Sequence, residues 1–308
     1  MKITEKLYSN TFFVAICAIL CCALWGSATP FIKIGYELIL PHKDVSSTIL
    51  FAGVRFFFAG LITILIYSIS RRKILYPQIS NCFNVFKLSL FQTIGQYIFF
   101  YIGLANTSGV KGTIISGSNA FFAILVSSLV FSQEKLSAKK IFACIIGFAG
   151  IVVVNLNGLD LNMNFLGDGF VLFSSISAAV SSTLIKKYSQ TEDTVVLSGY
   201  QFMLGGLILA ITGCIMGGKI YLNSGAAVGV LVYLAFLSAV AYTLWGILLK
   251  YNPVSKVTIY SFMIPVFGVI LSKLMLPESA DVSVINLIIT MVLVCTGIIM
   301  LNYNKSKK

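Results

Sequence analysis

The sequence predicts an all-α integral membrane protein of ten transmembrane helices, arranged as two inverted five-helix repeats. The prediction depends on the apolar composition, the length of the apolar runs and a duplication of the chain. Hydrophobic residues make up 58% of the 308 residues and charged residues only 10%, which is too little charge to cover a water-soluble domain of this size. The apolar residues come in runs of about 20, the length that crosses a bilayer as a helix.

Ten such runs follow one another along the chain. They are 12–35, 47–69, 84–105, 112–131, 139–155, 169–186, 195–217, 226–249, 257–276 and 283–302. The first follows Lys2 and Lys6, as in a signal peptide, but its length and its internal Gly26 and Pro30 argue against cleavage. Pro30 in the first run and Pro265 in the ninth should kink or break their helices.

The chain reads as a duplicated unit. The stretch from Gly112 to Asn155, two membrane helices joined by a turn with an acidic residue, returns near the C-terminus at an offset of 144 to 145 residues. The matching pairs are Ser116 with Ser261, Phe122 with Phe267 and Glu134 with Glu278. This offset divides the chain into repeats 1–157 and 158–308, and such duplication is typical of transporters.

The basic residues predict the orientation, because cytoplasmic loops carry an excess of Lys and Arg. With the N-terminus inside, sixteen basic residues lie at inner ends or loops: Lys2, Lys6, Arg71, Arg72, Lys73, Lys87, Lys135, Lys139, Lys140, Lys186, Lys187, Lys250, Lys256, Lys305, Lys307 and Lys308. Five lie outside: Lys33, Lys43, Lys111, Lys219 and Lys273. Both termini are therefore expected in the cytoplasm, and five spans per repeat make the repeats inverted. The polar stretch 155–168 is expected to be a solvated outer loop.

The net charge of +12 is explained by these basic loops, so no nucleic-acid partner is expected. Six of the seven cysteines lie in apolar runs without a Cys-x-x-Cys pair, as small packed hydrophobic residues do. The single histidine, His42, is in a loop. We expect no metal, no cofactor and no catalytic residues.

Arg55 stands near the middle of the second run, where an arginine costs roughly 2.5–3.5 kcal/mol on insertion scales. It is either an anchor for a substrate carboxylate or phosphate, or a structural arginine bonded to carbonyl oxygens and polar side chains. No Asp or Glu lies deep within any run, so the chain lacks the usual membrane-embedded carboxylate of proton-coupled carriers. Facilitated diffusion or exchange is therefore the expected mode.

Polar and aromatic residues recur at helical spacing in several runs, and such faces should point inward, away from lipid. They are Gln92, Gln96 and Tyr97 in the third run, Ser116 and Asn119 in the fourth, Ser177 in the sixth, and Tyr242, Trp245, Tyr260 and Ser261 in the eighth and ninth. Each can act as hydrogen-bonding glue between helices. Together they favour a wet central cavity.

Small residues spaced four apart, Gly213 with Gly217 and Ala143 with Gly147, indicate helix contacts.

The order and spacing of several short motifs resemble the EamA-type carriers of the drug/metabolite transporter superfamily, over nearly the whole chain. The motifs are Trp25-Gly26-Ser27, Arg55-Phe56, Gly103-Leu104-Ala105-Asn106-Thr107-Ser108, Glu134-Lys135-Leu136, Gly147 and Gly150, Ile264-Pro265-Val266 and Glu278, with Gln201 where Arg55 falls in the first half. The resemblance implies two inverted five-helix repeats around a central cavity. It also implies export or exchange of small metabolites such as amino acids.

The expected protein is thus a multi-pass transporter of the cell membrane that works by alternating access on a small-molecule substrate. It would act in the lipid bilayer as a monomer or weak homo-oligomer. Stacking on Trp25, Tyr97 or Trp245 and hydrogen bonds would hold a zwitterionic or neutral solute. The alternatives are an integral-membrane enzyme acting on lipid and a non-transporting membrane scaffold. Uptake of solutes into liposomes separates them.

Overall fold

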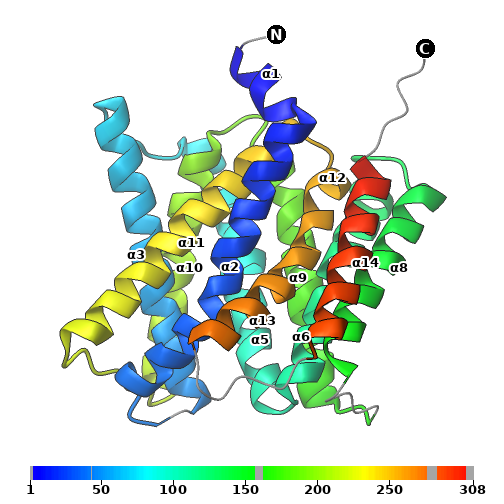
Figure 1. The fold of residues 1–308 in the computed structure, drawn as a ribbon. Helices are drawn as coiled ribbons and strands as arrows, with labels where there is room; N and C mark the ends of the chain where they lie inside the picture. The colour runs from blue at the N-terminus through cyan, green and yellow to red at the C-terminus, as the bar shows by residue number, and fades with distance from the viewer. Residues whose placement is uncertain (1–2, 43, 157–161, 276–282, 303–308) are drawn as a thin grey trace.

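The computed structural model describes residues 3–42, 44–156, 162–275 and 283–302. Over these residues the chain forms helices joined by turns, without a β-strand (Figure 1). The outer loop at 157–160, the boundary between the predicted repeats, Glu278 and the C-terminal lysines lie outside the described residues.

The first half contains α1 (Ile3–Ser9), α2 (Thr11–Ile39), α3 (Val45–Arg71), η1 (Ile79–Asn81), α4 (Cys82–Ser89), η2 (Leu90–Gly95), α5 (Gln96–Ala105), α6 (Gly109–Gly117), α7 (Asn119–Leu125), η3 (Val126–Val130) and α8 (Ala138–Val154). The second half contains η5 (Phe165–Gly169), α9 (Phe170–Tyr188), α10 (Thr194–Ile215), α11 (Gly225–Tyr251), α12 (Val254–Thr258), η6 (Ile259–Phe262), α13 (Met263–Met275) and α14 (Val284–Asn302).

Nine helical segments of the described chain are long and apolar enough to cross a membrane. They are Thr11–Ile39, Val45–Arg71, Ile79–Ala105, Gly109–Val130, Phe165–Tyr188, Thr194–Ile215, Gly225–Tyr251, Val254–Met275 and Val284–Asn302. The remaining predicted run, 139–155, forms α8, a helix of 17 residues that packs along α14 at one edge of the bundle (Figure 1).

Polar residues begin several of these helices by accepting hydrogen bonds from the first free backbone N–H groups, which otherwise have no partner. Asn10 caps α2, Asp44 caps α3, Ser137 caps α8, Asp193 caps α10 and Ser224 caps α11. The caps fix where the apolar segments start, and they explain why the observed boundaries lie close to the predicted ones.

The predicted proline breaks are only partly correct. Pro30 lies inside α2, which continues unbroken to Ile39. The segment Val254–Met275, which corresponds to the ninth predicted run, is interrupted by the 3-10 turn η6, directly before the helix that contains Pro265. The fourth span is divided at Ser118 without any proline.

The third span contains a π-helical segment, η2, and such segments often occur at functional sites.

Glycines allow α3 and α10 to lie against each other along most of their length. A Cβ atom on Gly206 would stand 2.3 Å from the backbone nitrogen of Phe57, and one on Gly60 would stand 2.4 Å from the carbonyl oxygen of Gly199. Such distances leave room only for hydrogen, so these glycines permit direct backbone contact. Because α3 and α10 belong to opposite halves, this contact joins the two halves of the chain.

The small-residue pairs have different outcomes. A Cβ on Gly297 of α14 would lie 2.6 Å from the carbonyl oxygen of Ala143 and 3.1 Å from the nitrogen of Gly147, so this pair is a helix contact. The prediction for Gly217 is wrong. It lies beyond the end of α10 with φ of 84° and nothing within 4 Å of its Cβ position, because it ends the helix in a left-handed turn.

One end of the bundle, here called the α1 end, carries α1 and the last turns of α3, α9, α11 and α14 (Figure 1). There the Asn252 amide donates to the carbonyl oxygen of Tyr8 (2.8 Å), and the Tyr67 hydroxyl donates to the Asp193 carboxylate (2.9 Å). At the opposite end, the backbone N–H of Tyr221 donates to the Ile39 carbonyl (2.8 Å). The hydrogen bonds thus hold the helix ends in two separate layers.

Candidate functional site

Arg55 lies in the middle of α3 and only 4% of its surface is exposed. Its Cζ atom lies 4.3 Å from the ring centroid of Phe56 and 5.9 Å from that of Tyr97. Cation–π attraction of this kind contributes about 2 kcal/mol in a desolvated site. Within the described part of the chain, neither Nε nor Nη1 of Arg55 has a hydrogen-bond partner. The positive charge is therefore buried against rings, with two donors left unused.

The two rings beside Arg55, Phe56 and Tyr97, belong to a linked group of six rings from five spans, which we call the aromatic cluster. They are Trp25 of α2, Phe56 of α3, Tyr97 of α5, Phe202 of α10, and Tyr242 and Trp245 of α11. The ring centroids lie 4.3 Å apart for Phe56 and Tyr97, 4.9 Å for Phe202 and Tyr242, 4.9 Å for Trp25 and Tyr242, and 5.0 Å for Trp25 and Trp245. The hydroxyls of Tyr97 and Tyr242 share a hydrogen bond of 2.7 Å. The structure therefore brings five of the predicted site residues together: Trp25, Arg55, Tyr97, Tyr242 and Trp245.

Buried amide groups lie on the same helices. Gln201 of α10 precedes Phe202 and is fully buried; its Oε1 accepts from the Thr93 hydroxyl (2.7 Å), whereas its Nε2 has no partner among the described residues. Oε1 of Gln92, which lies in η2, and Nε1 of Trp25 also lack a hydrogen-bond partner among the described residues. Gln96 is half-buried at the start of α5. Each buried polar group left unpaired costs about 1–3 kcal/mol, so water or a ligand should pair with these atoms.

Among the remaining polar residues of the predicted site, one forms a hydrogen bond between helices. The Ser177 hydroxyl of α9 donates to the Phe91 carbonyl (2.9 Å), a contact that joins α9 to the π-helical segment of the third span. Ser116 and Asn119 are half-buried on either side of the break at Ser118, and Oδ1 of Asn119 has no partner within the described chain. None of these three residues is recorded in contact with the aromatic cluster.

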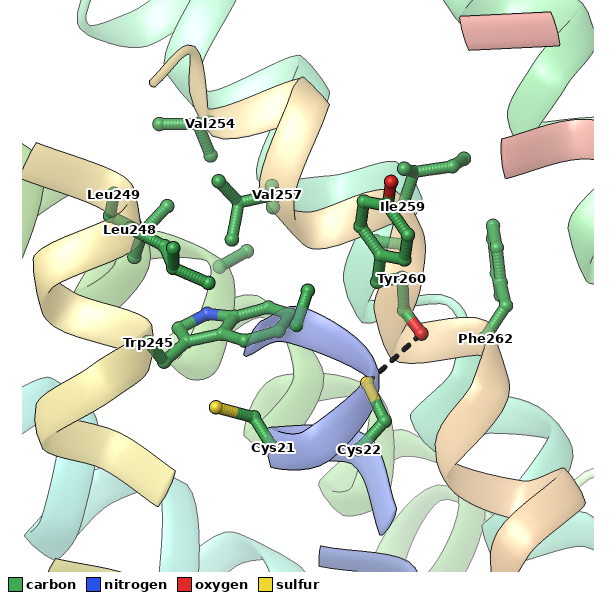
Figure 2. Packing of buried hydrophobic residues seen from close by; sticks show 14 of the residues in the cluster. Cys21, Cys22, Trp245, Leu248, Leu249, Val254, Val257, Ile259, Tyr260 and Phe262 are labelled. Carbon is green, nitrogen blue, oxygen red and sulfur yellow. Dashed lines mark hydrogen bonds between the residues drawn. The ribbon is translucent and has the colours of Figure 1, made fainter. Parts of the chain in front are cut away.

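Tyr260 and Ser261 lie in η6, where their bonds are local or structural. Figure 2 shows the Tyr260 carbonyl accepting from the Cys22 thiol (3.1 Å), beside the Trp245 ring. The Ser261 hydroxyl donates to the Thr258 carbonyl (2.7 Å). Around Trp245 the neighbours are apolar, among them Leu248, Leu249, Val254 and Val257 (Figure 2). This side of the aromatic cluster is a dry core.

Two surface hollows lie away from the predicted site residues. One is lined by Val269, Ile270, Lys273, Leu274, Val284 and Leu287, and the other by Ala105, Asn106, Thr107, Ser108, Lys111, Asn162, Met163 and Asn164. The predicted wet central cavity is not one of these hollows. The rings of the aromatic cluster instead pack against one another.

Glu134, at the α1 end, forms a contact between the halves that the sequence did not reveal. Its carboxylate accepts from the Ser127 hydroxyl (2.7 Å), the Lys140 ammonium (2.6 Å), and the backbone N–H (2.9 Å) and hydroxyl (2.5 Å) of Ser255 in α12. Burial alone would raise the pKa of Glu134, but the hydrogen bonds from Lys140, Ser255 and Ser127 outweigh it and hold this pKa below its ordinary value of 4.5. The carboxylate is therefore ionised at neutral pH, and we call this group of four residues the Glu134 network.

At the opposite end, Asp168 corrects a second expectation. The sequence predicts a solvated outer loop at this residue, yet only 1% of its surface is exposed. It lies 2.8 Å from the Lys111 ammonium and accepts from the Thr107 hydroxyl (2.5 Å). Because Lys111 lies 57 residues earlier, no local pattern in the sequence predicts the pair. It joins α6 to η5.

No group of three or more His, Cys, Asp and Glu side chains with the geometry of a metal site occurs in the described part of the chain.

The comparison with known families finds the EamA-like transporter family twice in this chain, over residues 12–156 and 165–303. The chain belongs to this family of membrane transporters.

Related proteins cover most of the chain. The uncharacterized transporter YvbV of Bacillus subtilis is 25% identical, over 92% of this chain and 89% of its own. An uncharacterized transporter of Archaeoglobus fulgidus is 25% identical, over 82% of this chain and 87% of its own. A WAT1-related chloroplastic protein of Arabidopsis thaliana is 21% identical, over 83% of this chain and 62% of its own.

A solved crystal structure shares the fold with a TM-score of 0.75 at 17% identity, over 94% of this chain and 96% of that one.

Proposed function

We propose that the protein is a secondary transporter that exports or exchanges small organic metabolites, such as amino acids, across the cytoplasmic membrane by alternating access. It would act as a monomer or weak homo-oligomer. The observation that carries the proposal is a set of buried polar atoms without a hydrogen-bond partner among the described residues, on the spans that carry the aromatic cluster: Arg55 Nε and Nη1, Trp25 Nε1, Gln92 Oε1 and Gln201 Nε2. Such atoms are costly in a protein that binds nothing, and they come from helices of both halves.

The proposed architecture is ten spans in two inverted repeats, with α8 as the tenth span. The double family match and the length of α8 support it. The Glu134 network closes the α1 end of the molecule, because it joins the end of the fourth span to the start of the ninth. For a solute to leave through that end, the contact between Glu134 and Ser255 would have to open.

The proposed orientation places the α1 end in the cytoplasm. We expect a single cysteine at position 72 to react with a membrane-impermeant maleimide only after the cells are permeabilised. A cysteine at position 222, in the loop before α11, should react in intact cells. Labelling of position 72 from outside would contradict the orientation.

Liposomes that contain the purified protein test the function. We expect them to take up at least one labelled metabolite of a panel of amino acids, nucleobases and sugars faster than protein-free liposomes, with saturation at high concentration. Saturable uptake would exclude a scaffold. Conversion of labelled lipid without uptake would favour a lipid-modifying enzyme instead.

A further inference from the structure

We propose that Arg55 binds the carboxylate of the transported solute, and that the site requires this carboxylate but not an amino group. The inference rests on the proposed transport function. It narrows the substrate class to organic carboxylates with an apolar body, whether or not they carry an amine.

Arg55 forms no salt bridge with an acidic side chain of the described chain. The salt bridges recorded within the described chain join Lys111 to Asp168 and Lys140 to Glu134, and neither involves Arg55. A buried cation without an anion is unfavourable unless charge or hydrogen bonds compensate it. The guanidinium presents a planar fork of donors that matches the two oxygens of a carboxylate. Its unused Nε and Nη1 atoms are thus the groups to which a carboxylate would bind.

Tyrosine hydroxyls near the Arg55 guanidinium can also bind an anion. The Cζ atom of Arg55 lies 5.9 Å from the centroid of the Tyr97 ring, and the Tyr97 hydroxyl shares a hydrogen bond with that of Tyr242. A tyrosine hydroxyl can donate to an anion as well as accept. In the 2.7 Å bond between Tyr97 and Tyr242 one hydroxyl donates its proton, and the hydroxyl that accepts keeps its own proton to donate elsewhere. The surroundings of Arg55 therefore stabilise an anion.

The ring faces of the aromatic cluster would contact the apolar part of the solute. The faces of Trp25, Phe56 and Phe202 are apolar surfaces that pack with rings or branched aliphatic groups. A solute that separates the rings would replace ring–ring contacts with equivalent contacts to its own apolar body. A small hydrophilic anion such as phosphate would offer no such replacement.

An amino group of the solute would find no carboxylate of the described chain available to pair with it at the aromatic cluster. Every acidic residue of the described chain lies in a loop or near a helix end, namely Glu5, Glu37, Asp44, Glu134, Asp168, Glu192 and Asp193. The buried carboxylates of Glu134 and Asp168 already hold lysines. An ammonium group at the aromatic cluster would therefore meet ring faces rather than a carboxylate. Repulsion by the nearby Arg55 charge opposes its cation–π attraction to those faces, so it should add little to the affinity.

The experiment measures the melting temperature of the purified protein with three matched solutes: L-phenylalanine, 3-phenylpropionate and 2-phenylethylamine. An aliphatic series uses L-leucine, 4-methylpentanoate and isopentylamine. Ligands that bind the folded state raise the melting temperature. We expect a rise with both carboxylates of at least one series and none with its amine. Because the series uses the unaltered protein, the result does not depend on whether a variant folds.

Two variants then locate the site. Arg55→Lys keeps the charge but not the planar fork, so we expect affinity for the carboxylates to fall about tenfold or more. Arg71→Gln removes an exposed arginine at the end of the same helix and should leave affinity unchanged.

An amine that binds as well as its carboxylate, no response to any carboxylate, or unchanged affinity in Arg55→Lys would overturn the proposal. Saturable uptake of amines or neutral solutes into liposomes would reject the carboxylate requirement and leave the transport function standing. Absence of uptake for every solute would reject the transport function itself.

Discussion

Replacing Glu134 with glutamine is expected to lower the melting temperature of the purified protein by several degrees at neutral pH. The amide keeps one acceptor oxygen, but its NH2 group would face donors, namely the Lys140 ammonium and the N–H of Ser255. Removing one partner of a buried ion pair costs about 3–5 kcal/mol. The Lys140 side chain is 17% exposed and water can compensate part of this loss, so we expect about 3 kcal/mol.

The effect should depend on pH in a defined direction. The folded-state pKa of Glu134 lies below its ordinary value of 4.5, so the stabilisation by its charge is fully present above that pH. It is lost as the pH falls through the folded-state pKa. The melting temperatures of wild type and Glu134→Gln should therefore converge in acid.

Glu5→Gln is the matched control, because Glu5 is exposed in α1 and the substitution is the same. It should melt like the wild type. Ser255→Ala should reproduce part of the Glu134→Gln effect, since it removes the 2.5 Å hydroxyl bond but keeps the backbone one. Equal melting temperatures of Glu134→Gln and Glu5→Gln at neutral pH would show that the Glu134 network does not hold the halves together.

Replacing Gly206 with alanine is expected to reduce the yield of folded protein and to lower its melting temperature. The new methyl group would lie 2.3 Å from the nitrogen and 2.8 Å from the Cα of Phe57, and 2.7 Å from the oxygen of Gly53. These are backbone atoms, so α3 and α10 would have to separate. Overpacking of a core costs about 1–3 kcal/mol, and a rigid backbone contact should reach the upper part of that range.

Gly229→Ala provides the comparison, since Gly229 lies in α11 with nothing within 4 Å of its Cβ position. Alanine favours a helix over glycine by about 1 kcal/mol, so this variant should melt no lower than the wild type. If both alanine variants melted alike, close contact between α3 and α10 would not be a source of stability.

The sequence predicts the helical elements well, because continuous apolar runs and capping residues are local signals. The irregular elements are less predictable. Pro30 lies in an unbroken helix, whereas the break at Ser118 follows Gly117 and involves no proline. Irregular segments depend on contacts between helices, such as the bond from the Ser177 hydroxyl to the Phe91 carbonyl in η2, and no local pattern encodes such contacts.

Part of the candidate site can be predicted from the sequence, because its residues are visible locally. Arg55 and the aromatic residues stand out as polar or bulky side chains in apolar runs, and packing brings them together. The contacts of Glu134 with Ser255 and of Asp168 with Lys111 span 121 and 57 residues of chain. Neither pairing has a periodic signal, because it depends on how the helix ends meet in the folded bundle.

In the proposed mechanism, a single site, open in turn to each side of the membrane, carries the solute. The most direct measurement is counterflow in liposomes that contain the protein, preloaded with unlabelled substrate and diluted into a trace of labelled substrate. We predict a transient accumulation of label inside, absent from liposomes that were not preloaded, and present without a pH gradient because the described spans hold no deep carboxylate. Label that only equilibrates would contradict alternating access. Accumulation that requires a pH gradient and is abolished by a protonophore would contradict transport driven by the solute's own gradient.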